Sequence, residues 1–113
     1  MTRLTNSARA AYRHEMAAAR NATTAERRWH HLERAHIVSQ PDAWLHTCNH
    51  VAMLTLAVRQ RDRREALGQV VRIFLAAPGS LTGRYPAGNT GRTAAGLTVP
   101  MPIPEDLRAA LAG

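Results

Sequence analysis

Apolar and polar residues alternate with a helical period over the first two-thirds of the chain. Between Thr5 and Asn21 the sequence is rich in alanine, and small or apolar positions recur three or four residues apart, which predicts a first helix. Such a stripe covers one face of a helix, so we expect it to be buried. Its members are Leu4, Ala8, Ala11, Tyr12, Glu15, Met16 and Ala19.

Two start signals follow, each of which predicts another helix. Thr23 and Glu26 have the spacing of a capping box, which predicts a second helix that ends near Val38. Pro41 suits the first position of a third helix, because that position needs no backbone donor, and the helical pattern then continues to Gln60.

A fourth helical segment is either continuous with the third helix or separated from it by a tight turn near Asp62. Pro78 and Gly79 predict that it ends at about Ala77. Its expected buried stripe consists of Ala66, Val70, Ile73, Phe74 and Ala77.

Beyond residue 77 the chain becomes rich in proline and glycine and loses its periodicity. Structureless connections of this length are uncommon inside compact domains. We therefore expect residues 78–113 to form an extended arm on the same domain or on a partner protomer, with a short helix from Glu105 to Leu111. The predicted fold is all-α, with about four helices in residues 1–77 followed by this arm.

Composition restricts the choice of partners. The chain has 113 residues and a net charge of +7, but all fifteen basic residues are arginines scattered along it, which favours solvated, salt-bridged helix faces over a nucleic-acid surface. It has no apolar run that could span a membrane, and it begins without the apolar stretch of a signal peptide. With Cys48 as its single cysteine, it is expected to be cytoplasmic.

The histidines supply the main clue to function. Glu33 and His36 are three residues apart, and His46 and His50 are four apart, so each pair shares one face of its helix. Helices joined by a short connection pack as antiparallel neighbours. We therefore predict that these four side chains converge on a transition metal ion, with Zn, Fe, Ni and Cu all compatible.

The remaining histidines are assigned by helix geometry. His31 is a candidate fifth ligand, or a ligand to a second protomer, whereas His14 and His30 are expected at the surface and Cys48 points away from the site. The alternative is that the histidines are half-buried residues bonded to carbonyls or carboxylates, with Glu33 paired to Arg34 or Arg59.

One hairpin shows a limited resemblance to a repeat family. Trp29, Leu32, Glu33 and His36 occupy the spacing of Trp, Leu, a small residue and Tyr in a tetratricopeptide helix, although no repeat recurs. The resemblance implies that Glu33 faces the start of the next helix, where His46 lies.

A wider resemblance covers Trp29 to Leu107. It rests on the segments 29–37, 46–54, 61–65, 78–80, 88–92 and 100–107. They resemble a bacterial family of unknown function whose small members are often encoded beside heavy-metal resistance or transport genes. The resemblance implies roles for His31, Glu33, His36, His46 and His50 in the helices, and for Asn89, Gly91 and Arg92 in the arm.

No motif pairs a nucleophile with a base, so an enzyme is not favoured, although an open metal site could polarise water. Gly88–Arg92 suits either a backbone nest for an anion or a simple turn. We expect a protein that buffers, stores or transfers a transition metal. The alternatives are a metal-free interaction module, including a homodimer formed through the arm, and an arginine-rich nucleic-acid binder.

Overall fold

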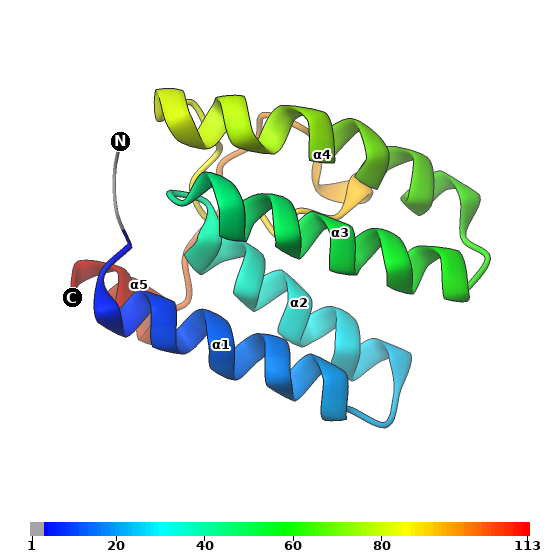
Figure 1. The fold of residues 1–113 in the computed structure, drawn as a ribbon, viewed down its shortest axis with the longest axis horizontal. Helices are drawn as coiled ribbons and strands as arrows, with labels where there is room; N and C mark the ends of the chain where they lie inside the picture. The colour runs from blue at the N-terminus through cyan, green and yellow to red at the C-terminus, as the bar shows by residue number, and fades with distance from the viewer. Residues whose placement is uncertain (1–3) are drawn as a thin grey trace.

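The computed structural model describes residues 4–113, and helices are the only regular secondary structure in this part of the chain. The all-α prediction is therefore confirmed. Met1–Arg3 lie outside the described residues. They begin the N-terminal stretch in which the sequence shows no apolar run of a signal peptide. The elements are α1 (Asn6–Asn21), α2 (Ala25–Ser39), α3 (Ala43–Arg59), α4 (Arg63–Thr82), the 3-10 helix η1 (Thr93–Ala95) and α5 (Glu105–Ala112) (Figure 1).

Each of the four long helices begins at a side chain that accepts a hydrogen bond from the backbone amide three residues later. These caps are Thr5, Thr24, Asp42 and Asp62. The predicted capping box at Thr23 is therefore wrong by one residue. The structure also decides between the two arrangements considered for the third and fourth helices, because a tight turn separates α3 from α4.

Helix α4 continues through Pro78 to Thr82, so the predicted end at Ala77 is wrong. Pro78 lies at the exposed surface, where a lost backbone hydrogen bond can be replaced by water. The following turn is held by Ser80, whose hydroxyl donates to the Gln40 carbonyl at 2.5 Å. The helix ends at Gly83, which has the left-handed φ of 71° that suits glycine.

An extended arm beginning at residue 78 is not found. Residues 78–82 belong to α4, the chain ends with α5, and the segment between them hydrogen-bonds to α2 and α4 of the same chain. Helix α5 packs beside the start of α1, where the Thr5 hydroxyl donates to the Ala110 carbonyl at 2.7 Å (Figure 1).

The apolar core lies mainly among α1, α2, α3 and α5. It confirms most of the stripe predicted for the first helix, since Leu4, Ala8, Tyr12 and Ala19 are all buried. Two clusters fill it: Ala19, Trp29, Leu32, Met53, Leu56 and Ala57 in one, and Tyr12, Ala35, Ile37, Val38 and Leu107 in the other.

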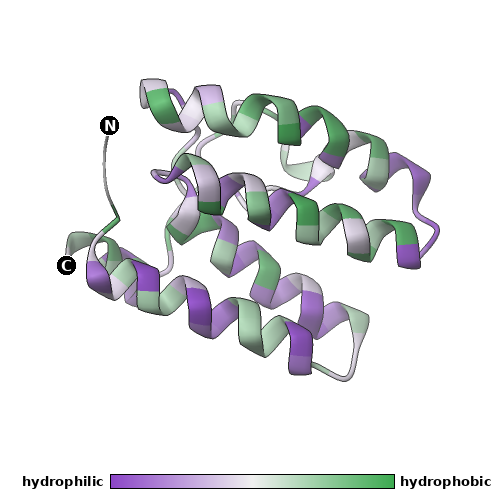
Figure 2. Cartoon of the chain, in the orientation of Figure 1, coloured by the Kyte–Doolittle hydropathy of each residue, from purple (hydrophilic) through white to green (hydrophobic). Residues whose placement is uncertain are grey.

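The buried face of α4 is polar, which corrects the stripe predicted for that helix. Figure 2 shows that α4 carries many apolar residues. Phe74 is 77% exposed and Val70 39%, so apolar side chains of α4 face outward. The side turned toward the molecule carries Glu65, Gln69, Arg72, Ala76 and Ser80. Although α4 is the longest helix, none of the helices described is both long and apolar enough to cross a membrane.

Candidate metal centre

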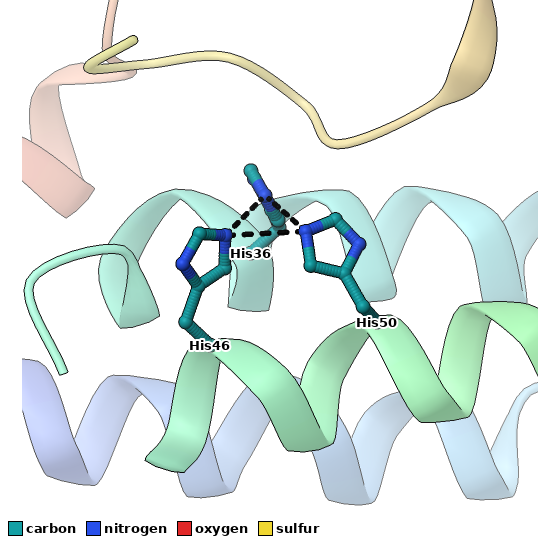
Figure 3. Close-up of side chains that lie close together, drawn as sticks. All are labelled: His36, His46 and His50. Atoms are coloured by element: carbon teal, nitrogen blue, oxygen red, sulfur yellow. Dashed lines mark hydrogen bonds between the residues drawn. The ribbon is translucent and has the colours of Figure 1, made fainter. Parts of the chain in front are cut away.

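Three imidazole rings meet between α2 and α3. His46 and His50 extend from successive turns of α3 toward His36 of α2 (Figure 3). The Nε2 atom of His36 lies 3.0 Å from that of His46 and 3.1 Å from that of His50, and the latter two are 3.1 Å apart. All three residues are buried, with at most 5% of their surface exposed.

The ring of His36 is held by the segment that follows α4. Its Nδ1–H donates to the Asn89 carbonyl at 2.6 Å. Gly91 packs against the ring with a φ of 84°, and a Cβ at this position would lie 2.6 Å from Cδ2 of His36. The Asn89 side chain accepts from the Gly91 amide at 2.8 Å and donates to the Val99 carbonyl at 2.8 Å. These residues form a turn that positions His36.

The other two rings are held by α4. Nδ1 of His50 lies 2.7 Å from Oε1 of Gln69, whose amide group donates to Glu65 and to the Gly91 carbonyl, so His50 is the donor. Nδ1 of His46 lies 2.9 Å from the hydroxyl of Ser80. That hydroxyl gives its single proton to the carbonyl of Gln40, just after α2, so His46 is again the donor.

These partners determine the tautomers of all three rings. Each Nδ1 carries the proton, so in the neutral rings each Nε2 presents a bare lone pair to the other two. Burial lowers the pKa of His46 to about 3 and that of His50 to about 4. Burial, together with the repulsion between imidazolium ions that protonating His36 beside His50 and His46 would bring, also lowers the pKa of His36 well below its ordinary value. The rings are therefore neutral near pH 7, in the form that binds metals.

A carboxylate anchors this arrangement from behind. Glu65 accepts hydrogen bonds from Gln69 at 2.9 Å, from Arg92 at 2.8 Å and from the Thr93 amide at 2.9 Å. Glu65 thus holds Gln69, and Gln69 holds the imidazole of His50. Metal-binding histidines in proteins are commonly oriented by hydrogen-bond partners of this kind.

The structure does not bring Glu33 or His31 to this cluster. Glu33 lies 3.4 Å from Nη1 of Arg92, so it contacts an arginine, but this partner is neither of the two that the alternative named, Arg34 and Arg59. Burial, only partly opposed by Arg92, raises the pKa of Glu33. His31 instead contacts Glu15 of α1 at 2.7 Å. His14 and His30 are exposed, as expected.

Two residues that orient the rings, Gln69 and Ser80, were missed by the sequence reasoning, whereas Asn89 and Gly91 were named there through the family resemblance alone. Gln69 lies on the α4 face that was expected to be exposed, and Ser80 lies beyond Ala77, where the helix was expected to end. A signal was present, because Glu65, Gln69, Arg72, Ala76 and Ser80 recur three or four residues apart and form a polar stripe.

A pocket opens beside the three rings. It has a volume of about 490 Å³, and its lining includes His36, His46 and His50 together with residues of α4 and of the segment after it. The three nitrogens therefore form a concave donor set that a small ion or molecule can approach from one side. A set of three neutral imidazoles can hold a metal ion and leave a coordination position free.

Comparison with known proteins adds the family of the chain. Neither the curated proteins nor the solved structures include a match. A family model described as "Protein of unknown function (DUF3703)" matches residues 6–111, which include all three histidines of the cluster and the residues that orient them. The chain therefore belongs to the DUF3703 family.

Proposed function

We propose that the protein binds one transition metal ion through Nε2 of His36, His46 and His50. The observation that carries this proposal is that all three Nδ1 atoms donate elsewhere, so three lone pairs face one another at 3.0 to 3.1 Å. Lone pairs at that separation repel unless a cation lies between them. In an ideal tetrahedral site with Zn–N bonds of ~2.0 to 2.1 Å, the nitrogens are about 3.3 Å apart, so only a small adjustment is needed.

Zinc is the ion that fits this donor set best. Three histidines with a free fourth position are a common zinc arrangement, whereas Cu(I) favours thiolate or thioether donors. Among the described residues, the group of His, Cys, Asp and Glu side chains close enough to hold an ion consists of these three histidines alone. The pocket supplies an entry path, which supports a role in storing or transferring the ion.

The proposal is tested with untagged protein stripped by a chelator and titrated with Zn²⁺ against a chromophoric competitor. We expect one equivalent per chain, and a loss of affinity of at least about a hundredfold in His46→Ala and in His50→Ala, because each removes a ligand. The exposed His30→Ala is the matched control and retains the affinity of the wild type. Glu33→Gln also retains it, since this carboxylate contacts Arg92.

Protein that stays metal-free with Zn²⁺, Cu²⁺, Ni²⁺ and Co²⁺ would overturn the proposal. Loss of zinc in Glu33→Gln but not in His46→Ala would instead move the site toward α2. Elemental analysis of the purified protein identifies the ion that it carries.

A second candidate function, self-association, is favoured by a separate observation. The outward faces of α3 and α4 carry large apolar side chains, among them Trp44 at 74% and Phe74 at 77% exposure. Apolar patches on this scale commonly mark interaction surfaces. A dimer formed through them is compatible with metal binding, because the three buried histidine rings lie between α2 and α3.

A further inference from the structure

The pocket beside the three histidines also contains a buried positive charge. Arg72 of α4 lines it and is only 8% exposed. Its guanidinium donates to the carbonyls of Gly68 at 3.1 Å and Thr93 at 3.4 Å, and no ion pair with a carboxylate is found for it among residues 4–113. Burying a charge without a directly paired counter-charge is unfavourable. An anion in the pocket would remove that penalty.

A metal ion at the proposed site makes the case for an anion stronger. Three neutral imidazoles leave the two positive charges of a divalent ion uncompensated, and Arg72 adds a third. Glu65, whose charge favours the protonated form of Arg72, already accepts hydrogen bonds from Arg92 and Thr93. Because the three histidines and Arg72 line the same pocket, an anion bound there would be near both the guanidinium and an ion held by the histidines.

The rest of the pocket indicates what the anion carries. Leu75, Ala76, Pro78, Pro86 and Leu97 contribute apolar surface to its lining, and Arg84 adds a second positive charge. Its volume of about 490 Å³ falls within the range of sites for small organic ligands, ~300 to 1,000 Å³. A bare inorganic anion would leave the apolar lining unused.

Resting on the proposed metal site, we propose that this pocket binds a small organic carboxylate, with the carboxylate group between the metal ion and Arg72 and the apolar part of the molecule against Leu75 and Leu97.

The test uses Co²⁺-loaded full-length protein, because the visible absorption of Co²⁺ reports a change of its fourth ligand. Hexanoate is the probe, hexanamide is its neutral counterpart, and acetate and inorganic phosphate lack the apolar chain. We expect hexanoate to shift the Co²⁺ bands and to bind at least about tenfold more tightly than acetate or phosphate, since each buried methylene contributes about a fourfold factor. Hexanamide leaves the bands unchanged.

Variants test the part played by the guanidinium. Arg72→Gln is expected to weaken hexanoate binding by about tenfold or more while Co²⁺ is retained, and Arg72→Lys to weaken it less. The matched control is Arg13→Gln, at an exposed position of α1, which binds hexanoate as the wild type does. If Arg72→Gln does not fold, the comparison of hexanoate with hexanamide and acetate in the wild type still tests whether the pocket binds an organic carboxylate.

The proposal is overturned if Co²⁺ is retained but hexanoate changes nothing, if hexanamide, acetate or phosphate binds as tightly as hexanoate, or if folded Arg72→Gln binds hexanoate as the wild type does. None of these outcomes contradicts the proposed metal site. A wild-type protein that does not retain Co²⁺ overturns both proposals, so the two failures are distinguishable.

Discussion

At the scale of single residues, Gly91 limits how the rings of the site can pack. A methyl group here would meet Cδ2 of His36 at 2.6 Å and its Nε2 at 2.9 Å, at a φ of 84° that side chains disfavour. We therefore predict that Gly91→Ala lowers zinc affinity about tenfold or more and the free energy of unfolding by about 1 to 3 kcal/mol. Competition titration and denaturant unfolding measure the two effects.

Gly83 offers a matched control for that prediction. It has a similar φ of 71°, but a Cβ there would meet no atom within 4 Å. Gly83→Ala should therefore reduce stability through the backbone alone and leave zinc affinity unchanged. If Gly91→Ala binds zinc as Gly83→Ala does, packing against His36 is not what the glycine provides.

Gln69 provides the second prediction at this scale. Its carbonyl oxygen accepts from His50 at 2.7 Å, which fixes the ring orientation and its tautomer. Gln69→Leu keeps a similar volume but removes this acceptor, so we predict a loss of zinc affinity of about 10- to 100-fold. Competition titration measures it. Gln60→Leu, which removes an amide bonded to Trp29 and remote from the rings, is the control. Equal affinities in the two variants would argue against an orienting role for Gln69.

At the scale of elements, the buried face of α4 gives the fold a dependence on pH. Burial alone would raise the pKa of Glu65, but hydrogen bonds from Arg92, Gln69 and Thr93 outweigh it and lower the pKa to about 2. Because the folded value lies below the ordinary value of 4.5, the stabilisation is complete above pH 4.5 and is lost as the pH falls toward 2.

We therefore predict that metal-free wild-type protein loses about 1 to 3 kcal/mol more stability than Glu65→Gln between pH 4.5 and 2. Denaturant unfolding at a series of pH values measures it. The other carboxylates and the buried histidines titrate in both proteins, so their contributions cancel in the comparison. The exposed Glu26→Gln should follow the wild type. Parallel pH profiles for wild type and Glu65→Gln would contradict the prediction.

Helix positions and the histidine faces could be predicted from the sequence because they depend on local signals. Spacings of three and four residues placed His36, His46 and His50 on facing sides of two neighbouring helices, and the structure brings these three together. Glu33 lies three residues before His36, but its side chain does not join the histidine cluster. Its partner Arg92 is 59 residues away, and no local pattern encodes such a contact.

The orientation of α4 shows the other limit. The prediction assumed that its apolar face is buried, but that rule fails when the interior next to a helix is polar. Here the histidines and the turn at Asn89 occupy that interior, so Gln69 and Ser80 face inward. The likeness of α2 and α3 to a tetratricopeptide hairpin stays a prediction.

At the scale of the whole molecule, the outward-facing apolar side chains follow a regular pattern. On α3, Trp44, Val51 and Val58 are 74%, 46% and 59% exposed and recur every seven residues. On α4, Leu67, Phe74 and Leu81 repeat the same spacing at 69%, 77% and 54% exposure. Two adjacent helices with seven-residue apolar repeats are suited to pack against an identical pair, as in a four-helix bundle.

We predict that the protein forms a dimer through this face, because pairing two copies removes both apolar surfaces from water. Analytical ultracentrifugation of the wild type should show the dimer, and Phe74→Glu should weaken it at least about tenfold by burying a charge in the interface. Ala10→Glu adds the same charge to an exposed site on α1 and should leave the dimer intact. Zinc binding by Phe74→Glu checks that its fold is preserved.

One alternative from the sequence was a dimer formed through residues 78–113, and a third variant separates the two interfaces. Val99 lies in the segment between α4 and α5 and is 51% exposed, so Val99→Glu places a charge on that surface without opening the core. If α3 and α4 form the interface, Val99→Glu stays dimeric while Phe74→Glu dissociates. The reverse result would place the interface on the C-terminal segment. A wild-type protein that is monomeric at every concentration would exclude both interfaces.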